Sequence, residues 1–316
     1  FTGSATVVKS DDISKVQSSD VTRALEGVVA GVQMTTSSGS LGSSPSIRIR
    51  GTGSISAGNA PLYVVDGVPF SGDMNNLNTA DIESMTVLKD AASNALYGAR
   101  GANGVILVTT RRGKEGRNQI AVSSSFGLTQ ALRNLYGVSS YEYASLYTET
   151  QKNDNPKIKD SELAFSPYVT ELFRTGADPI MFPNIEWNDY LFKDFAWQTQ
   201  HNVTLSGGGK KAKYFVSAGF MHQDGMMKKY YESYNSNFTY NRYNFRANVD
   251  VNITPTTVLS ANIGARIGVQ SAPNNYDIWR NIMWCTPFAS AGFVDGKRIY
   301  NPNNPFIILP AQTSGL

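Results

Sequence analysis

The side chains that most often do chemistry are scarce in this chain. It has one cysteine, Cys285, and two histidines, His201 and His222. A single cysteine excludes a disulfide framework and a cysteine-rich metal site, and two histidines are too few for most zinc sites. Both histidines fall at expected strand positions, and no serine–histidine–acid or cysteine–histidine set is convincing. The sequence therefore predicts no catalytic residue, no metal site and no cofactor, so we expect a protein that is not an enzyme.

Glycines and carboxylates also favour structural roles. The Gly-Thr-Gly at 51–53 lacks the third glycine and the following helix of a dinucleotide loop, and 207–210 lacks the P-loop spacing. Asp66, Glu83 and Asp90 are predicted to be turn residues and helix caps rather than acid–base catalysts.

The stretch 61–110 has the pattern of a compact mixed sheet with small helices. Leu62–Val65, Met85–Leu88 and Val105–Val108 are short apolar runs, rich in branched residues and bounded by turn residues. Between the last two runs, a short helix is predicted from the cap Asp90 to a stop at Gly98.

The residues before this stretch predict smaller elements of the same unit. We expect strands at Ala5–Val8 and Val32–Thr36, and a capped helix from Asp20 to Gly31 between them. Apolar and basic residues alternate from Ile47 to Gly53, which is typical of a half-buried strand.

After the polar segment 111–117 the pattern changes to longer strands. One face of each is apolar and the other strongly polar, although the third strand also places Phe215 and Met221 on its polar face. A soluble β-sandwich would look the same locally, but the strand length and the polarity of the second face favour a membrane barrel. The five expected strands are 120–128, 197–205, 214–222, 242–253 and 259–269.

The connections between these strands predict their direction. The turns at 207–212 and 254–257 are short, whereas the connections at 130–196 and 224–241 are long. In membrane barrels short turns face the periplasm and long loops face outward. We therefore expect the first strand to rise from the periplasmic side.

The first long loop carries helix signals of its own. Ser139 and Glu142 form a capping box ahead of a helix through Tyr147, and Ser166-Pro167 opens a second helix that Gly176 can close. A loop of this size is usually a lid or a binding surface. Its aromatic residues suit stacking on sugars or peptide side chains, or they pack the loop against itself. With two tryptophans of the stretch after Gln270, the candidate substrate-binding residues are Tyr141, Trp187, Trp279 and Trp284.

Three long segments carry a family resemblance. Leu62-Tyr-Val-Val-Asp-Gly-Val-Pro69, Asp81–Asp90 and Leu96–Thr110 resemble, in this order, the plug domain of the SusC/RagA family of TonB-dependent outer-membrane transporters. The resemblance implies an α+β plug domain with a small mixed sheet at 1–115. It also implies that 116–316 are the N-terminal strands of a large antiparallel transmembrane β-barrel with long extracellular loops. The family's barrel has about 22 strands, and five are expected here, so we expect a piece of a longer transporter.

The same resemblance implies the activity and the partners. We expect TonB-dependent import of an oligosaccharide or oligopeptide across the outer membrane of a Bacteroidota-type bacterium, with a SusD-like lipoprotein and a dimer of such pairs as one arrangement. TonB would act through an N-terminal segment that this sequence does not include. The alternative is an outer-membrane receptor or adhesin that binds without transporting. The net charge of +3 implies no nucleic-acid partner, and the absence of an apolar run of about 18 residues excludes a helical span.

The family's plug arginines pair with carboxylates on the barrel wall. The resemblance assigns this role to Arg48, Arg50 and Arg100. A charge at such a contact would be partly removed from water and would need a partner. The other interpretation is that these arginines lie on a solvated strand face.

Overall fold

The computed structural model divides the chain into two compact units, which we describe separately. The first unit comprises residues 1–128, 197–224 and 239–270, and the second comprises 129–196, 225–238 and 271–316. Within them, the structure describes residues 5–15, 20–36, 39–51, 58–89, 95–131, 137–229, 237–272, 282, 284–289, 293–294 and 297–298. No helix of the described residues is long and apolar enough to cross a membrane.

The first unit contains the predicted mixed sheet. Its strands lie in the order β1 (Ala5–Lys9), β6 (Ile82–Leu88), β7 (Val105–Thr110), β4 (Leu62–Val65) and β5 (Val68–Phe70). β4 pairs with β7 in parallel, and the other neighbours pair antiparallel. The β4–β5 turn places Asp66 at φ 49° and Gly67 at φ 88°. All three apolar runs at 61–110 are therefore strands of one sheet, as predicted.

Successive side chains of each strand point to opposite faces of this sheet. Buried apolar clusters lie on both faces. Ile106 and Val108 join the larger core, together with Met85 and Val87, the apolar residues of η1 (Val21–Leu25) and Met74 of η2 (Met74–Asn76). Val105 joins a smaller core with Leu62, Val64 and Leu88 on the other side. The remaining short elements of this region are α1 (Ser10–Lys15), β2 (Val32–Thr35), β3 (Ser46–Ile49), η3 (Thr79–Asp81) and η4 (Ala95–Gly101).

The helix predicted from Asp20 to Gly31 is wrong in length. Asp20 does cap it, and its Oδ1 accepts from the Thr22 backbone N–H at 2.8 Å. The helix is a 3₁₀ helix that ends at Leu25, because Glu26 takes an extended ψ of 126° and Gly27 follows with a left-handed φ of 72°.

The helix predicted from Asp90 to Gly98 needs a similar correction. The predicted cap, Asp90, and residues 91–94 lie outside the described residues, so the cap stays a prediction. Gly98 does not end the helix but interrupts η4 with φ 59° and ψ −149°, and the 3₁₀ geometry resumes as far as Gly101.

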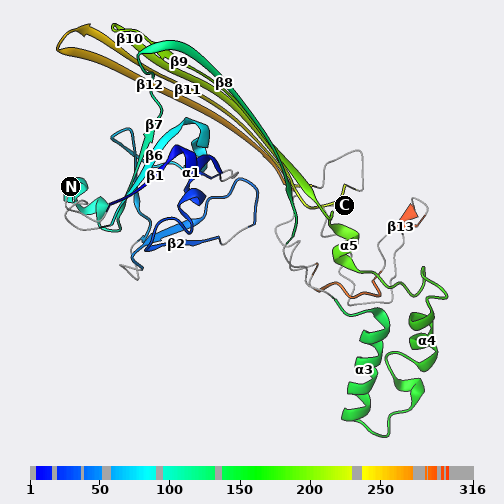
Figure 1. Cartoon of the computed structure of the whole chain (residues 1–316). Helices are drawn as coiled ribbons and strands as arrows, with labels where there is room; N and C mark the ends of the chain where they lie inside the picture. The colour runs from blue at the N-terminus through cyan, green and yellow to red at the C-terminus, as the bar shows by residue number, and fades with distance from the viewer. Residues whose placement is uncertain are drawn as a thin grey trace. The chain divides into compact units, whose positions relative to one another are not determined.

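The five predicted long strands form one antiparallel sheet in sequence order, which we call the wall sheet (Figure 1). Each strand is longer than the alternation alone suggested, because pairing continues past the last regular residue. The strands are β8 (Gly116–Thr129), β9 (Ala196–Gly208), β10 (Ala212–Asp224), β11 (Thr239–Thr254) and β12 (Thr257–Ser271).

The two faces of the wall sheet differ as the alternation predicts. Phe245 and Ile263 are exposed on the apolar face at 46% and 60%. On the other face Asn248 is buried, and so are Phe215 and Met221 of the irregular third strand. Apart from Phe215 and Met221, the apolar face of the wall sheet is thus the one in contact with the surroundings, whereas a soluble sandwich places its apolar face inside.

The second unit is mainly helical. It contains α3 (Ser140–Asp154), η5 (Asp160–Glu162), α4 (Pro167–Thr175), α5 (Trp187–Leu191), β13 (Phe293–Val294) and β14 (Lys297–Arg298). The capping box of Ser139 and Glu142 is present, although α3 continues past Tyr147. Ser166 caps α4, and Gly176 ends it at φ 63°. Both predicted helix starts are therefore confirmed.

Candidate functional site: the plug–wall contact

The polar face of the wall sheet contacts residues between Leu41 and Arg112 of the same unit. We call residues 5–110 the plug region. At the centre of the contact, Arg246 of β11 lies between two plug carboxylates, with Nε 3.6 Å from Asp81 Oδ2 and Nη1 3.9 Å from Asp66 Oδ2. The three side chains are only 12%, 5% and 7% exposed, respectively. An ion pair so far removed from water depends on both partners, because either charge alone would be costly to bury.

Further hydrogen bonds hold the two carboxylates in place. Asp66 accepts from the Thr110 backbone N–H at 2.9 Å and from its hydroxyl at 2.6 Å, so the left-handed β4–β5 turn is joined to the end of β7. Asp81 accepts from Ser217 Oγ of β10 at 2.5 Å. Burial raises the pKa of Asp81, and this effect exceeds the lowering by Ser217 and by the charges of Arg246, Arg111 and Arg242.

A second set of contacts fastens the end of β7. Asn248 Nδ2 donates to Thr110 Oγ1 at 2.9 Å and to the Arg111 carbonyl at 2.7 Å. Arg112 Nη1 donates to Asp250 Oδ1 at 2.9 Å. The segment that joins the plug region to β8 is therefore bound to the middle of β11.

A neutral contact lies on the β9 and β10 side. Asn78 Nδ2 donates to Asn202 Oδ1 at 2.6 Å, and Gln200 Nε2 donates to Asn78 Oδ1 at 3.2 Å. A Cβ on Gly219 would collide with both Asn78 and Asn202, so this glycine leaves room for the contact. Amide pairs of this kind need good geometry but no charge.

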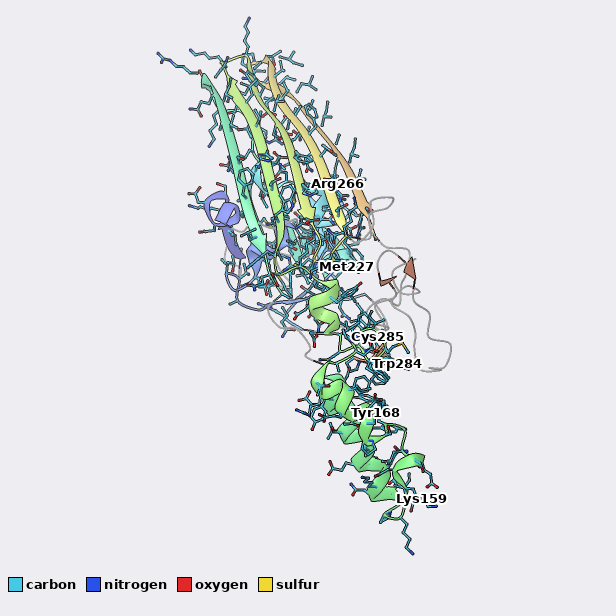
Figure 2. The ribbon with its side chains drawn as sticks, turned by 90° about the vertical axis from the view of Figure 1, so that its right-hand side faces the viewer. Lys159, Tyr168, Met227, Arg266, Trp284 and Cys285 are labelled. Carbon is cyan, nitrogen blue, oxygen red and sulfur yellow. The ribbon has the colours of Figure 1, made fainter. Side chains whose placement is uncertain are left out.

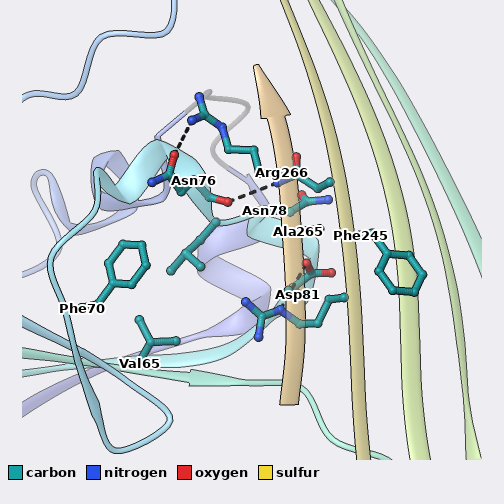
Figure 3. Close-up of a pocket in the computed structure, with 12 residues that line it drawn as sticks. Val65, Phe70, Asn76, Asn78, Asp81, Phe245, Ala265 and Arg266 are labelled. Carbon is teal, nitrogen blue, oxygen red and sulfur yellow. Dashed lines mark hydrogen bonds and ion pairs between the residues drawn. The ribbon is translucent and has the colours of Figure 1, made fainter. Parts of the chain in front are cut away.

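The third region lies around η2. Arg242, 1% exposed, donates from Nη1 to the Asn75 carbonyl at 3.0 Å, and Asn244 Nδ2 donates to the Asn76 carbonyl at 3.2 Å. Arg266 of β12 donates to Asn76 Oδ1 and, through Nη2, to the Tyr240 hydroxyl at 2.5 Å. Figure 3 shows Arg266 beside Asn76 on the plug-facing side of the wall sheet, and Phe245 pointing away from it.

The second unit holds the sequence-predicted binding residues that the structure describes. Trp187 is 6% exposed and donates its indole N–H to the Thr286 carbonyl at 2.9 Å, whereas Trp284 is 69% exposed (Figure 2). Both line a cavity of about 780 Å³. Burial raises the pKa of the neighbouring Cys285 thiol to about 11. Tyr141 is exposed on α3, and Trp279 lies outside the described residues.

Other aromatic residues of this unit pack against one another. Phe165 and Phe288 lie with ring centroids 5.4 Å apart at a steep angle, and Tyr143 lies 5.1 Å from Phe288. Edge-to-face contacts of this kind stabilise a core. The alternative interpretation, that the loop aromatics pack the loop to itself, describes Tyr143, Tyr147 and Phe165, whose rings contact one another, and Phe288 of the later stretch packs against this group.

The comparisons with known proteins agree with this arrangement. The family model "TonB-dependent Receptor Plug Domain" matches residues 1–105. The TonB-dependent receptor SusC of Bacteroides thetaiotaomicron is 30% identical over 334 aligned residues, which cover 96% of this chain and 31% of SusC. The TonB-dependent receptor P39 of Formosa agariphila is 32% identical, with 96% of this chain and 27% of P39 covered.

Solved structures give the same result. The RagAB peptide importer in its "closed-closed" state matches with a TM-score of 0.72 and 28% identity, over 86% of this chain and 31% of that chain. The chain is SusC/RagA-like. It spans about a third of the length of the relatives it matches. The siderophore receptor PirA of Acinetobacter baumannii, at 15% identity and a TM-score of 0.53, shares the fold alone.

In the SusC/RagA-like chain, the described plug–wall ion pairs centre on residues that were not predicted for this role. Arg48, Arg50 and Arg100 are exposed, and their pairing with wall carboxylates stays a prediction. Instead, the wall supplies Arg246 and the plug region supplies Asp66 and Asp81. The available signal was Arg246 on the polar face of an alternating strand, where a charge that faces a wet lumen costs little.

No group of three or more histidine, cysteine or acidic side chains suited to a metal ion occurs in the part of the SusC/RagA-like chain that the structure describes. His201 Nδ1 lies 2.7 Å from Ser124 Oγ, and His222 Nδ1 lies 2.7 Å from Asn241 Oδ1. Both histidines are thus on wall strands, as the sequence indicated.

Proposed function

We propose that this SusC/RagA-like chain is part of a TonB-dependent importer in a bacterial outer membrane. The plug region would block the lumen of a barrel whose first five strands are β8–β12. TonB would pull on the plug region, and cargo would pass once the plug–wall contact has been remodelled. The likeness to proteins described as receptors and importers supports this role rather than an enzymatic one.

One observation carries the proposal: the wall sheet has two unlike faces. Its polar face fixes Asp66 and Asp81 of the plug region through Arg246, and its apolar face exposes residues such as Phe245 and Ile263. A strand with this division suits a barrel with lipid outside and a wet, plugged lumen inside. The division of the protein into a plug domain at 1–115 and a barrel from 116 onward belongs to the same proposal.

The proposal includes partners and a cargo class. A SusD-like lipoprotein would close over the outer loops, two such pairs would associate as a dimer, and the cargo would be an oligopeptide or an oligosaccharide. The similarity to SusC and to an importer described in "open-open" and "closed-closed" states supports this assignment. Tyr141, Trp187, Trp279 and Trp284 remain the proposed cargo-contacting residues.

The contact chemistry suits a plug that moves under force. Amide pairs such as Asn78–Asn202 and single ion pairs can exchange their partners for water, since the lumen is polar. Met85 and Val87 of the larger core make none of these side-chain hydrogen bonds or ion pairs with the wall sheet. The plug–wall contact can therefore open while both residues stay packed. A force applied to the plug region would therefore break side-chain contacts before it separated the strands of the wall.

A reversible tether between plug and wall tests the proposal. In the full-length transporter with Cys285→Ala, the pair Asn78→Cys and Asn202→Cys replaces two side chains whose amides are 2.6 Å apart, and a short bis-methanethiosulfonate reagent links the two thiols through disulfides that a reductant cleaves. Uptake of labelled oligopeptides and of labelled oligosaccharides is measured separately, in cells with and without TonB. We expect uptake to require TonB, to stop when the disulfides form and to return on reduction.

A tether within the wall is the matched control. Val203 and Ala218 are register partners on β9 and β10, so cysteines there join two strands of the same sheet. This control should leave uptake unchanged. The alternative function, a surface receptor or adhesin that does not transport, would give binding without TonB-dependent uptake, and the Asn78–Asn202 tether would have no effect on it.

A further inference from the structure

The cavity between η2–η3 and strands β11–β12 is lined by an arginine, Arg266, whose hydrogen-bond partners are neutral. It measures about 400 Å³ and is lined by Asn76, Asn78, Asp81, Arg246 and Arg266 with apolar neighbours such as Phe70 (Figure 3). Of its two arginines, Arg246 pairs with Asp81 and, outside the lining, with Asp66, so both carboxylates are on Arg246 and neither is paired with Arg266. A positive charge at a partly desolvated contact requires an anionic partner or an equivalent set of acceptors.

The carboxylates at this contact are already engaged. Asp66 and Asp81 both pair with Arg246, and Asp81 also accepts from Ser217. The partners of Arg266 are neutral, namely Asn76 Oδ1 and the Tyr240 hydroxyl. Its Nε–H is buried and has no hydrogen-bond partner among the described residues. Arg266 therefore has a donor to spare and no opposite charge within the described contact.

The position of Arg266 makes it reachable from the loop side. Tyr240 is the second residue of β11, directly after the long connection at 225–238, and Arg266 lies five residues before the end of β12 at Ser271. The short turn between β11 and β12 lies at the opposite end of the sheet. On the proposed orientation of the barrel, Arg266 is thus in the loop-side part of the plug–wall contact, four residues before Gln270, which donates to the Leu41 carbonyl at 3.2 Å.

We propose that Arg266 is the anchor of a carboxylate-binding site in the loop-side part of the plug–wall contact. A guanidinium presents parallel N–H donors that match the two oxygens of a carboxylate. Asn76 and Asn244 line the same cavity. The side-chain amide of Asn76 accepts from Arg266, and the amide of Asn244 donates to the Asn76 backbone carbonyl, so both side chains help to fix the position of Arg266. The apolar wall around Phe70 and Leu77 lowers the local dielectric constant and strengthens the pairing.

The carboxylate can have one of two sources. It belongs either to the cargo, as a peptide C-terminus, an acidic side chain or a uronic acid, or to a glutamate or aspartate of a barrel strand beyond these 316 residues. The cargo source rests on the proposed function, whereas the pairing chemistry does not. Both sources share the requirement for the positive charge of Arg266.

The test uses the purified full-length transporter and acetate as the probe. The thermal midpoint of the plug region is followed by calorimetry in sodium acetate and in neutral acetamide, at equal ionic strength. The variants are Arg266→Gln, Arg266→Lys and the matched control Arg117→Gln, an exposed arginine at the start of β8. Glutamine retains an amide donor for Asn76 and Tyr240 but removes the charge, so this variant isolates the charge.

If the carboxylate comes from outside, acetate raises the midpoint of the wild type in a saturable way. The half-saturating concentration should rise roughly ten- to a hundredfold in Arg266→Gln, and Arg266→Lys should retain part of the response. If the carboxylate belongs to the barrel, acetate has no effect, but Arg266→Gln lowers the midpoint well below that of Arg117→Gln, and Arg266→Lys restores part of it.

Two results would overturn the proposal. One is an equal acetate response in the wild type and Arg266→Gln. The other is no acetate response together with an Arg266→Gln midpoint equal to that of Arg117→Gln. None of these measurements involves uptake, so a failure of the import proposal and a failure of this site can be told apart.

Discussion

Arg246 of β11 and Asp81 of η3 lie 3.6 Å apart, from Nε to Oδ2, although 165 residues of sequence separate them. Asp66 approaches the same guanidinium at 3.9 Å from the β4–β5 turn. Because Arg246 is on the wall sheet and both acids are on the plug region, this triad joins the two through buried opposite charges.

We expect Arg246→Met to loosen the plug region. The variant leaves two buried carboxylates without their cation, and removing one partner of a buried pair costs about 3–5 kcal/mol. Hydrogen exchange of the full-length protein, read on amides of β4 and β7, should show faster exchange than in the wild type. Arg117→Met is the control, because Arg117 is exposed. Equal exchange rates in the two variants would show that the triad does not hold the plug.

Removing all three charges should do less harm than removing one. In the triple variant Arg246→Met, Asp66→Asn, Asp81→Asn no uncompensated charge remains, and such replacements are often close to neutral. The same exchange experiment should show protection between that of the wild type and that of Arg246→Met. Protection lower than in Arg246→Met would contradict an ionic origin of the effect.

Acid should strengthen the docking of the plug region through Asp81. Burial raises the pKa of Asp81 in the docked state, whereas a detached plug region has the ordinary value. The docked state therefore binds the proton at a higher pH than the detached state, and lowering the pH through this interval favours docking. Above the raised pKa both states are ionised, and this dependence disappears.

The pH effect is measured as the urea midpoint for release of the plug region at neutral and acidic pH. Other groups also titrate, so the informative quantity is the difference between the wild type and Asp81→Asn at each pH. The wild type should gain relative to the variant as the pH falls. A relative loss would mean that the pairing with Arg246 outweighs the effect of burial.

Gly113→Ala should disturb the connection between the plug region and β8. A Cβ on Gly113 would overlap the backbone of Tyr214 on β10, and neither backbone can move away easily. Gly209→Ala is the control, because a Cβ there meets nothing within 4 Å. Protease sensitivity after Arg112 should rise in Gly113→Ala and stay unchanged in Gly209→Ala. Equal sensitivity would show that the close approach is not required.

Cys285 should react slowly with maleimides. Burial raises the pKa of its thiol to about 11, so only about one molecule in a thousand is ionised at pH 8. A cysteine at the exposed Lys159, introduced with Cys285→Ala, should label at least about a hundredfold faster. Rapid labelling of Cys285 in the wild type would contradict its burial in the second unit.

The sequence patterns predicted the elements better than their contacts. Strict alternation located β11 and β12, because a period of two assigns each side chain to a face. The helix after Asp20 was overextended, since apolar spacing does not show where Gly27 turns left-handed. Gly98 misled in the same way, because a glycine can interrupt a helix as well as end it.

The contacts depended on long-range pairing that local patterns do not encode. Ser217 and Asp81 are 136 residues apart, as their hydrogen bond shows. The family resemblance directed attention to Arg48, Arg50 and Arg100, whereas the triad uses arginine from the wall and acids from the plug region. Asp66 was interpreted as a turn residue, and it is one. Its carboxylate also binds Thr110 and Arg246, which the turn signal alone does not reveal.

The most direct test of the account is the environment of the two faces of β11 in the full-length protein in lipid bilayers. Spin labels are placed singly at Tyr243, Phe245 and Ala247, and at Asn244, Arg246 and Asn248. Their collision rates with oxygen, which dissolves in lipid, and with a water-soluble nickel chelate are then compared. We predict high oxygen access for the first set and low access for the second. If labels at Tyr243, Phe245 and Ala247 were shielded from both probes, or were reached mainly by the nickel chelate, the wall sheet would not face lipid. This result would contradict the import proposal as well.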